Sequence, residues 1–179
     1  MMDKIVVLDF GSQYSHLICR RIRDFSVYAE LLPFDTSLEN IKKLNPKGVI
    51  FSGGPSSVYD SNAPVPDGKI FQLNVPILGI CYGHQIIVNS FGGKIKRANK
   101  EYGSSVLTID NNSDIFNGIG DSVRAWMSHG DEAENVPEDF EIIGHTESSR
   151  SAAIANKQKT VFGIQFHPEV VHTEKGTEI

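Results

Sequence analysis

The chain has 179 residues, of which 40% are hydrophobic and 22% are charged, and its formal net charge at pH 7 is −5. Such a length and composition are typical of one soluble domain with a substantial hydrophobic core. The acidic balance argues against nucleic acid or an anionic membrane as the main partner, because both bind basic protein surfaces. We therefore expect a single domain that spans residues 1–179 and binds neither nucleic acid nor a membrane.

The cysteine content and the apolar runs restrict the compartment. Cys19 and Cys81 are the only cysteines, too few for a disulfide framework, and no cluster of Cys and His has the spacing of a zinc site. The apolar run at the N-terminus is too short for a signal peptide, and no run approaches the roughly 20 residues of a membrane span. These features predict a cytoplasmic protein without a metal. A basic cluster at residues 94–100 predicts a solvated hairpin edge and is a candidate for partner docking.

The chain opens with a strand pattern followed by helix patterns. Residues 4–10 (KIVVLDF) form a β-branched apolar run, and apolar residues recur at helical spacing between residues 14 and 25. Thr36 and Glu39 match a capping box, which predicts that a second helix begins there and ends before Pro46. One strand and two helices are therefore expected before Pro46.

Two further apolar runs, residues 48–52 and 76–80, predict the next strands. A helix pattern follows the second run and ends at Gly92-Gly93, a pair typical of a glycine C-cap. Strands that are apolar throughout and alternate with helices are typical of a parallel sheet covered on both faces. We therefore predict an α/β fold whose first half forms a parallel sheet.

From about residue 94 the pattern changes to short alternating runs, with few helical patterns between them. These runs predict antiparallel strands that extend the sheet. They cover residues 103–109, 122–128, 140–146, 151–155 and 160–166.

The stretch GICYGHQ places Cys81 between two glycines, Gly79 and Gly83, where a strand is expected to turn into a helix. A nucleophile on such a turn has a strained backbone, and glycines two residues on either side remove the Cβ atoms that would collide there. The start of the following helix also favours a thiolate, the reactive form of cysteine. Cys81 is therefore a candidate nucleophile. The alternative is an inert buried thiol whose neighbouring glycines only permit tight packing.

His167 is the candidate base, because a cysteine nucleophile that attacks an amide needs an imidazole and a third group that orients the ring. In an extended segment residues i and i+2 point to the same side, so Glu169 can accept a ring N–H of His167. Pro168 favours the extended conformation at the residue before it. We therefore expect His167 and Glu169 to form the base and its orienting carboxylate.

A glycine-rich loop, residues 52–56 (SGGPS), follows the predicted strand at 48–52. Ligands of open α/β sheets bind at the carboxyl ends of strands, so this loop, Cys81 and His167 can converge on one crevice. The loop offers backbone N–H groups to an oxyanion, and it lacks the lysine of a phosphate-binding loop. Taken alone, such a loop is usually only a turn.

In this order, the GGP loop, the G-x-C-x-G-x-Q stretch and the H-P-E stretch resemble the class I (triad) glutamine amidotransferase family over essentially all 179 residues. The resemblance implies a flavodoxin-like, open, mostly parallel twisted sheet with helices on both faces and antiparallel additions in the C-terminal half. It also implies that the chain hydrolyses the side-chain amide of L-glutamine to glutamate and ammonia, without a metal or an organic cofactor. Cys81, His167 and Glu169 match the catalytic triad of the family.

The same resemblance implies roles for residues around the triad. Gly54 and Tyr82 match the positions whose backbone N–H groups form the oxyanion hole, which stabilises the negative charge that develops on the amide oxygen. Gln85 matches a residue that contacts the substrate glutamine. The segment whose backbone grips the amino-acid end of the substrate matches Ser128, His129 and Gly130. The imidazole of His129 is not expected to act as a second base.

Three stretches look like the amidotransferase portion of GMP synthetases, more than like the anthranilate or carbamoyl-phosphate relatives. They are LDFGSQYSHLICRRIR at residues 8–23, WMSHGDE at 126–132 and HPEVVHTEKG at 167–176. This likeness implies a heteromeric partner, an ATP-pyrophosphatase (synthetase) subunit that binds ATP and Mg²⁺ and uses the ammonia to convert XMP to GMP. Asp131 and His172 are candidates for contact with that partner. Because the sequence stops at Ile179, we expect a separate amidotransferase subunit rather than an excised domain.

Three other functions remain open on the sequence alone. The same chemistry can serve another synthase, of the aminodeoxychorismate or anthranilate type. The same sheet and cysteine can belong to a γ-glutamyl hydrolase or a cysteine peptidase. The chain can also be a non-catalytic binding module in which Cys81 has lost its role. The partner's identity and the reactivity of Cys81 toward glutamine-like reagents distinguish these functions.

Overall fold

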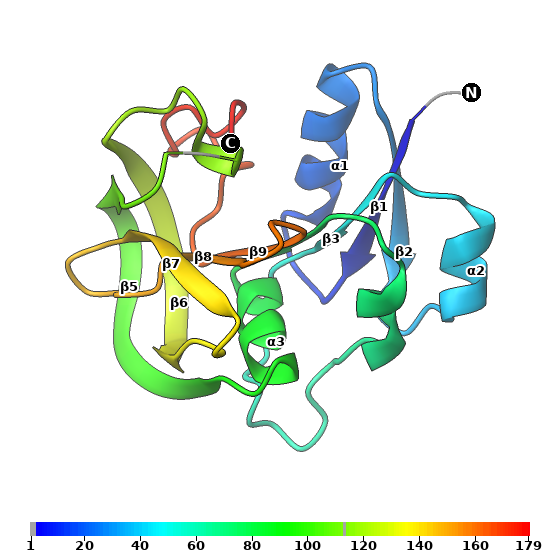
Figure 1. The fold of residues 1–179 in the computed structure, drawn as a ribbon, viewed down its shortest axis with the longest axis horizontal. Helices are drawn as coiled ribbons and strands as arrows, with labels where there is room; N and C mark the ends of the chain where they lie inside the picture. The colour runs from blue at the N-terminus through cyan, green and yellow to red at the C-terminus, as the bar shows by residue number, and fades with distance from the viewer. Residues whose placement is uncertain (1–2, 113) are drawn as a thin grey trace.

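The computed structural model describes residues 3–112 and 114–179. Within these residues the strands form one nine-stranded sheet in the order β2-β1-β3-β4-β9-β8-β7-β5-β6, and helices lie on both of its sides (Figure 1). The strands are β1 (Lys4–Asp9), β2 (Tyr28–Pro33), β3 (Gly48–Phe51), β4 (Ile77–Ile80), β5 (Lys94–Ile109), β6 (Ser122–Asn135), β7 (Phe140–His145), β8 (Ala153–Asn156) and β9 (Val161–Ile164). The α-helices are α1 (Ser15–Asp24), α2 (Leu38–Lys43) and α3 (Tyr82–Ser90), and the 3₁₀ helices are η1 (Gly68–Gln72) and η2 (Asp114–Phe116).

The half of the sheet that contains β1 is parallel. β1 lies between β2 and β3, β4 follows β3, and β9, which comes last in the chain, pairs with the other side of β4. The register sets Gly79 opposite Gly163 and Ile80 opposite Ile164. Because β4 and β9 run in the same direction, the segments that follow them leave the sheet at the same edge. Those segments carry Cys81 and His167.

The other half of the sheet is antiparallel, as four of the five alternating runs predicted. The prediction was wrong for the fifth run, residues 160–166, because it became β9, which pairs in parallel with β4 at the centre of the sheet. β8 pairs with β9, β7 with β8, and the hairpin of β5 and β6 completes the sheet. Among the described strands, four pairings are parallel and four are antiparallel, so the antiparallel addition is as large as the parallel part.

The basic cluster at residues 94–100 belongs to the β5–β6 hairpin, as predicted. β5 begins at Lys94 and not at the expected run of 103–109, because the basic end of β5 pairs with the acidic end of β6. Lys96 lies opposite Glu132, and the two side chains form an ion pair at 3.3 Å. Partner docking at this cluster stays a prediction.

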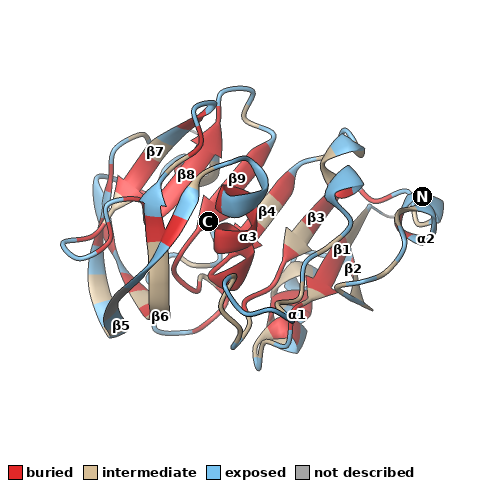
Figure 2. Ribbon diagram, turned by 90° about the horizontal axis from the view of Figure 1, so that it is seen from below, coloured by how far each residue is buried: buried red, intermediate tan, exposed pale blue. Residues whose placement is uncertain are grey.

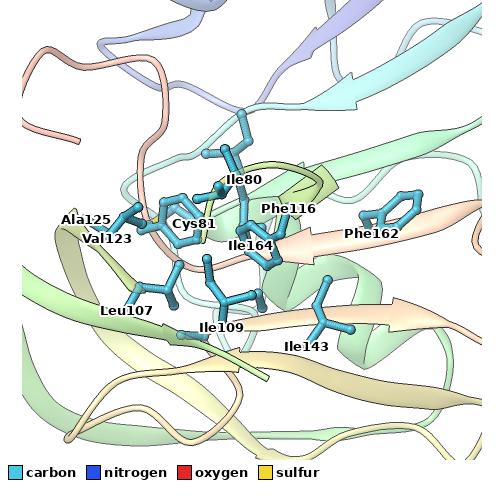
Figure 3. Close-up of a cluster of buried hydrophobic side chains, with 14 of the residues drawn as sticks. Ile80, Cys81, Leu107, Ile109, Phe116, Val123, Ala125, Ile143, Phe162 and Ile164 are labelled. Atoms are coloured by element: carbon cyan, nitrogen blue, oxygen red, sulfur yellow. The ribbon is translucent and has the colours of Figure 1, made fainter. Parts of the chain in front are cut away.

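Two hydrophobic clusters cover the two faces of the sheet. Along β1, Val7 belongs to one cluster and its neighbours Val6 and Leu8 belong to the other, as expected for side chains that alternate along a strand. α1 packs into the first cluster through Ile18, and α2 packs into the second through Ile41. Figure 2 shows the buried residues concentrated in the central strands and α3, and Figure 3 shows part of the first cluster. The predicted α/β fold with helices on both faces is therefore confirmed.

Two local features differ from the expectations. The sequence pattern does not predict β2, whose residues YAELLP show no alternation; this edge strand forms because its backbone pairs in register with β1.

The N-cap of α2 is Ser37, whose Oγ accepts from the Asn40 N–H. The hydroxyl of Thr36 instead donates to the carbonyl oxygen of Pro33. The capping box predicted from Thr36 is therefore wrong by one residue, because the neighbouring hydroxyl takes the cap position.

α3 ends at the pair Gly92-Gly93, as predicted. Gly92 has a φ angle of +86°. The N–H groups of Gly92 and Gly93 donate to the carbonyl oxygens of Asn89 and Val88, which is the pattern of a Schellman cap. No helix among the described residues is long and apolar enough to cross a membrane.

Candidate active site

Cys81 lies at the turn between β4 and α3 in the conformation of a nucleophile elbow. Its φ and ψ angles are 53° and −104°, a conformation that costs a residue other than glycine of order 1–3 kcal/mol. A Cβ on Gly79 would collide with the Gly83 carbonyl, and a Cβ on Gly83 would lie 2.5 Å from the Phe51 carbonyl oxygen. Both glycines are therefore required by the turn, and the predicted elbow is confirmed.

The thiol of Cys81 faces the strand that carries the predicted substrate segment. Its Sγ donates a weak hydrogen bond to the Ser128 carbonyl oxygen, 3.5 Å away. The residue is 6% exposed, and Figure 3 shows it among core side chains that include Ile80 and Ile164. The cysteine therefore packs against the core on one side and borders an open cleft on the other.

His167 and Glu169 form the imidazole–carboxylate pair expected from the H-P-E stretch. Nδ1 of His167 donates to Oε1 of Glu169 at 2.8 Å, which leaves Nε2 as the ring nitrogen available to the Cys81 sulfur. His167 and Glu169 are both buried. The Tyr14 ring packs edge-on against the imidazole, with the ring centres 5.3 Å apart. Glu169 and Tyr14 thus fix the orientation of the imidazole.

The surroundings of His167 favour the protonated ring. Burial lowers the pKa of the imidazole, but hydrogen bonds to Cys81 and Glu169, together with the charges of these residues, raise this pKa to about 10. A protonated imidazole between a sulfur and a carboxylate stabilises negative charge on both neighbours. The arrangement therefore places a protonated imidazole beside Cys81, where it can stabilise the thiolate that a cysteine nucleophile uses.

The glycine-rich loop after β3 meets both Cys81 and His167, as the sequence predicted. A Cβ on Gly53 would lie 3.3 Å from Cε1 of His167 and 3.6 Å from Cβ of Cys81. The loop therefore passes against both side chains, and a larger residue at this position would press on the two reacting groups.

Gly54 and Tyr82, the residues expected to form the oxyanion hole, line the same cleft as Cys81. A Cβ on Gly54 would lie 2.5 Å from the Phe10 carbonyl oxygen, so the loop can approach the residue that follows β1 this closely only with glycine. Tyr82 is the first residue of α3, and its N–H therefore has no acceptor within the helix. Because both residues line the cleft, their N–H groups are candidates for stabilising an oxyanion there.

These groups border a cleft of about 740 Å³. The residues predicted for the site that line it are Gly54, Cys81, Tyr82, Gln85, Ser128, His129, Gly130 and His167. The remaining predicted residue, Glu169, does not line the cleft and acts on it through its hydrogen bond to the imidazole. Among the described residues, no group of three or more His, Cys, Asp or Glu side chains is placed to hold a metal ion.

Gln85 is held in a defined orientation on α3. Its Nε2 donates to the Asp131 carbonyl oxygen at 3.0 Å and lies 3.5 Å from Oε1 of Gln165. The side-chain NH₂ group is thus directed at the protein. Its Oε1 remains as the atom that could accept a hydrogen bond from a substrate in the cleft.

The imidazole of His129 is engaged within the protein. Its Nδ1 lies 3.1 Å from the Asp131 carbonyl oxygen, and its Nε2 lies 2.9 Å from a carboxylate oxygen of Glu101. Burial raises the pKa of Glu101, but hydrogen bonds from Ser148, Ser105 and His129 lower it below its usual value. The ionised Glu101 holds the ring in place. That His129 is not a second base stays a prediction.

His84 follows Cys81 by three residues but does not line the cleft. The side chain is fully buried against β9, where a Cβ on Gly163 would lie 2.5 Å from Nδ1 of the ring. Burial lowers the pKa of His84, and the charge of the nearby His129 lowers it further, to about 3. The ring is therefore neutral and serves as a packing group between α3 and β9.

Several residues that support the site carry no recognisable signal in the sequence. Arg21 of α1 donates from Nε to the Glu169 carbonyl oxygen at 3.0 Å. Ser57, which directly follows the glycine-rich loop, donates to the Asp131 carboxylate at 2.5 Å. Thr173 donates to the carbonyl oxygen of the histidine in the H-P-E stretch. The contacts of Arg21 and Ser57 join segments that are far apart in the chain, and Thr173 also accepts from the distant Trp126 N–H. A lone polar residue does not reveal such a partner.

The two residues expected to contact a partner lie in different settings. Asp131 is held by Ser57 in the wall of the cleft. His172 is exposed, and its ring packs on Trp126 with the ring centres 4.7 Å apart. His172 is therefore the better placed of the two, and contact of either with a partner stays a prediction.

Known proteins match the chain over nearly its whole length. A family model described as glutamine amidotransferase class-I matches residues 6–179. The glutamine-hydrolyzing GMP synthase of Brachyspira hyodysenteriae is 54% identical over 179 residues, which are 99% of this chain and 35% of that protein. The GMP synthase of the same description from Lactobacillus acidophilus is 55% identical over 179 residues, again 99% of this chain and 35% of that protein. The chain thus spans about a third of the length of the curated relatives it matches.

Solved structures share the fold. A protein from Thermoplasma acidophilum, described as one subunit of a GMP synthase, has a TM-score of 0.89 at 30% identity, with 99% of this chain and 90% of that chain covered. A glutamine amidotransferase from Thermotoga maritima has a TM-score of 0.76 at 18% identity, with 95% and 77% covered, which shows a common fold alone. These similarities confirm the flavodoxin-like fold expected from the sequence. The chain belongs to the class-I glutamine amidotransferase family.

Proposed function

We propose that the chain is the glutaminase component of a GMP synthetase, which hydrolyses L-glutamine and supplies ammonia for the conversion of XMP to GMP. The observation that carries the proposal is the elbow at Cys81, whose sulfur meets the His167–Glu169 pair at the edge of one cleft. The relatives described as glutamine-hydrolyzing GMP synthases, at 54% and 55% identity, support the choice of acceptor.

The proposed reaction uses the thiolate of Cys81 as the nucleophile. The sulfur adds to the carbon of the glutamine side-chain amide, and the N–H groups of Gly54 and Tyr82 stabilise the negative charge on the oxygen. His167 then gives its proton to the departing nitrogen, so that ammonia leaves and a γ-glutamyl thioester remains. In the second half, His167 removes a proton from a water molecule, whose oxygen attacks the thioester and releases glutamate and the Cys81 sulfur.

The substrate would bind between α3 and β6. Gln85 is oriented to receive the glutamine, and the backbone of residues 128–130 lines the same cleft next to the Cys81 sulfur. We propose that the chain needs no metal or organic cofactor, because the cysteine, the imidazole and the carboxylate supply the nucleophile, the proton donor and its orientation.

The partner is proposed to be an ATP-pyrophosphatase subunit that binds ATP and Mg²⁺ and forms a heteromer with this chain. The similarity to a protein described as one subunit of a GMP synthase supports a separate synthetase partner. A cytoplasmic location is proposed as well, because both cysteines are free thiols, as is usual in a reducing compartment.

The test mixes the chain with glutamine alone, and then with a synthetase partner, XMP, ATP and Mg²⁺. Glutamate and GMP are measured in parallel, and ammonium replaces glutamine in a control reaction. We expect GMP from glutamine only when chain and partner are both present, and weak glutamate release from the chain alone. A partner that makes GMP from ammonium but never from glutamine plus this chain would contradict the proposal.

The alternatives give different outcomes in the same experiments. Glutamate release that depends on a chorismate-using synthase would assign the chain to the aminodeoxychorismate or anthranilate type. Alkylation of Cys81 by a glutamine-like chloroketone, blocked by free glutamine, argues against a peptidase. If the chain releases no glutamate with any partner, the remaining alternative is a non-catalytic binding module.

A further inference from the structure

Thr173 connects the segment of the candidate base to the strand that carries the substrate segment. Its hydroxyl donates to the His167 carbonyl oxygen at 2.6 Å and accepts from the Trp126 N–H at 2.9 Å. The Trp126 carbonyl oxygen in turn accepts from the His167 N–H at 3.0 Å. The three residues thus close a ring of hydrogen bonds between β6 and the segment that follows β9.

In this ring the hydroxyl replaces a direct bond between two backbones. Two residues that face each other in an antiparallel pair can exchange both N–H···O bonds directly. Here the bond from His167 to Trp126 is direct, and the return path passes through the Thr173 hydroxyl. Thr173 therefore sets the spacing between His167 and β6. Ser128, whose carbonyl oxygen receives the bond from Cys81, lies two residues further along that strand.

The ring of hydrogen bonds is more important for the position of His167 than for the position of β6. β6 is also held along its other side by β5, where Tyr102 lies opposite Ser128. His167 lies beyond the end of β9, and both its N–H and its carbonyl oxygen bond within the ring. Loss of the Thr173 hydroxyl would therefore displace His167 rather than Ser128.

The hydroxyl is not needed to attach the segment around Thr173 to the protein. The N–H of Glu174 donates to the Arg124 carbonyl oxygen at 2.9 Å, and the Arg124 N–H donates to the Glu174 carboxylate at 3.0 Å. Lys175 donates from Nζ to the Ile119 carbonyl oxygen at 2.8 Å. These bonds remain when the hydroxyl is removed, so the segment is expected to stay folded against β6.

We propose that Thr173 is a positioning residue, whose buried hydroxyl holds His167 at the working distance from Cys81. The inference rests on the proposed glutaminase function and deepens it. Removal of the hydroxyl is expected to lower kcat about tenfold, because small displacements of a proton donor slow the chemical step strongly. KM for glutamine is expected to change less than about twofold, since β5 continues to hold Ser128.

The test compares variants that keep or lose the hydroxyl. Thr173→Ser keeps it, Thr173→Ala removes it at nearly the same size as serine, and Thr173→Val removes it at the size of threonine. Thr36→Val is the matched control, because the Thr36 hydroxyl also donates to a backbone carbonyl, that of Pro33, but lies outside the cleft.

For each variant we measure glutamate release, the alkylation of Cys81 and thermal stability. Glutamate release in the presence of the partner gives kcat and KM. Iodoacetamide alkylates Cys81 in the chain alone, and the pH dependence of the rate reports how His167 affects the reactivity of the thiol. This measurement needs neither glutamine nor the synthetase partner. Thermal unfolding shows whether each variant is folded.

We expect Thr173→Val and Thr173→Ala to lose about tenfold in kcat and to alkylate more slowly with a shifted pH profile. Thr173→Ser and Thr36→Val are expected to stay within about twofold of the wild type. If Thr173→Val does not fold, the difference in kcat and alkylation rate between the Ser and Ala variants tests the proposal. Folded Val or Ala variants with the wild-type kcat and alkylation profile would overturn the proposal, since Thr173 would then only stabilise the fold. If the wild type releases no glutamate with any partner, the proposed function fails, and the alkylation comparison still tests Thr173.

Discussion

Arg21 on α1 donates a hydrogen bond from Nε to the carbonyl oxygen of Glu169, 3.0 Å away and 148 positions later in the chain. The side chain of Glu169 in turn accepts from His167. A residue near the beginning of the chain thus holds the backbone of the carboxylate that orients the candidate base.

Arg21→Ala is expected to lower kcat about three- to tenfold, because the backbone of Glu169 loses a fixed point. The free energy of unfolding is expected to fall by about 1 kcal/mol, the net value of a typical hydrogen bond. Glutamate release and urea unfolding measure the two effects. Arg20→Ala is the control, since Arg20 is exposed on the same helix. An equal loss in both variants would assign the effect to charge rather than to the contact with Glu169.

The candidate triad predicts a graded series of losses. Cys81→Ala and His167→Ala are each expected to lower kcat a thousandfold or more, to about the same residual rate, because the two residues act as a unit. Glu169→Gln is expected to be milder, about ten- to a hundredfold, because an amide oxygen can still accept from Nδ1 of His167 but carries no charge. Steady-state glutamate release measures each variant.

Cys19→Ala is the control for the series, because Cys19 is the other cysteine and packs in the core away from the cleft. Burial raises the pKa of the Cys19 thiol, which makes it a poor nucleophile. The control is expected to keep the wild-type rate. A wild-type rate in His167→Ala would remove this residue from the mechanism.

Gly83→Ala tests whether the elbow needs its second glycine. The new Cβ would lie 2.5 Å from the Phe51 carbonyl oxygen and 2.7 Å from the Phe51 Cβ, so α3 or β3 must shift. We expect a loss of about 1–3 kcal/mol in the free energy of unfolding, and a lower kcat because Cys81 moves with α3. Gly68→Ala is the control, because a Cβ there meets no atom within 4 Å. Similar stability in the two variants would show that the close approach is not needed.

Glu101→Gln tests the support under the substrate segment. The Glu101 carboxylate holds the ring of His129, which lines the cleft. Its replacement by an uncharged amide loosens residues 128–130, so KM for glutamine is expected to rise about three- to tenfold with a smaller change in kcat. Glu138→Gln on the exposed surface is the control and is expected to leave KM unchanged.

The same variant has a predicted pH dependence. The pKa of Glu101 in the folded protein lies below its ordinary value of 4.5. A carboxylate with a lowered pKa contributes stability above its unfolded pKa and loses it as pH falls through the folded pKa. The stability difference between the wild type and Glu101→Gln is therefore expected to be constant near neutral pH and to shrink below about pH 4.5. Chemical unfolding at several pH values measures it, and a difference that grows in acid would show that the sign is wrong.

The regular elements that bury a continuous apolar run were predictable from the sequence. The runs before Gly53 and Cys81 became β3 and β4, and Gly92-Gly93 ended α3 as a Schellman cap. Two kinds of feature were not predictable. β2 is an edge strand with a mixed pattern, and its pairing with β1 decides its conformation. The cap of α2 had two adjacent hydroxyls to choose from, and Ser37 took the position that the pattern assigns to Thr36.

The reactive residues of the site were predictable, but their supports were not. The elbow and the H-P-E pair carry their chemistry in local patterns, because glycines flank Cys81 and Glu169 lies two residues after His167. Glu101, Arg21 and Thr173 act through hydrogen bonds to distant segments, which carry His129, Glu169 and Trp126. No local pattern marks such contacts, since each partner belongs to a different part of the chain.

The sequence by itself determined the candidate nucleophile, the candidate base and its orienting carboxylate, because backbone strain, glycine spacing and the alternation of an extended segment are local properties of the chain. Only the tertiary structure decided that these groups meet. β9 pairs with β4 in a register that sets Ile164 opposite Ile80, so the segments that carry His167 and Cys81 leave the sheet together. Strand order and register are set by packing over the whole sheet, which joins parts of the chain that no short stretch can specify.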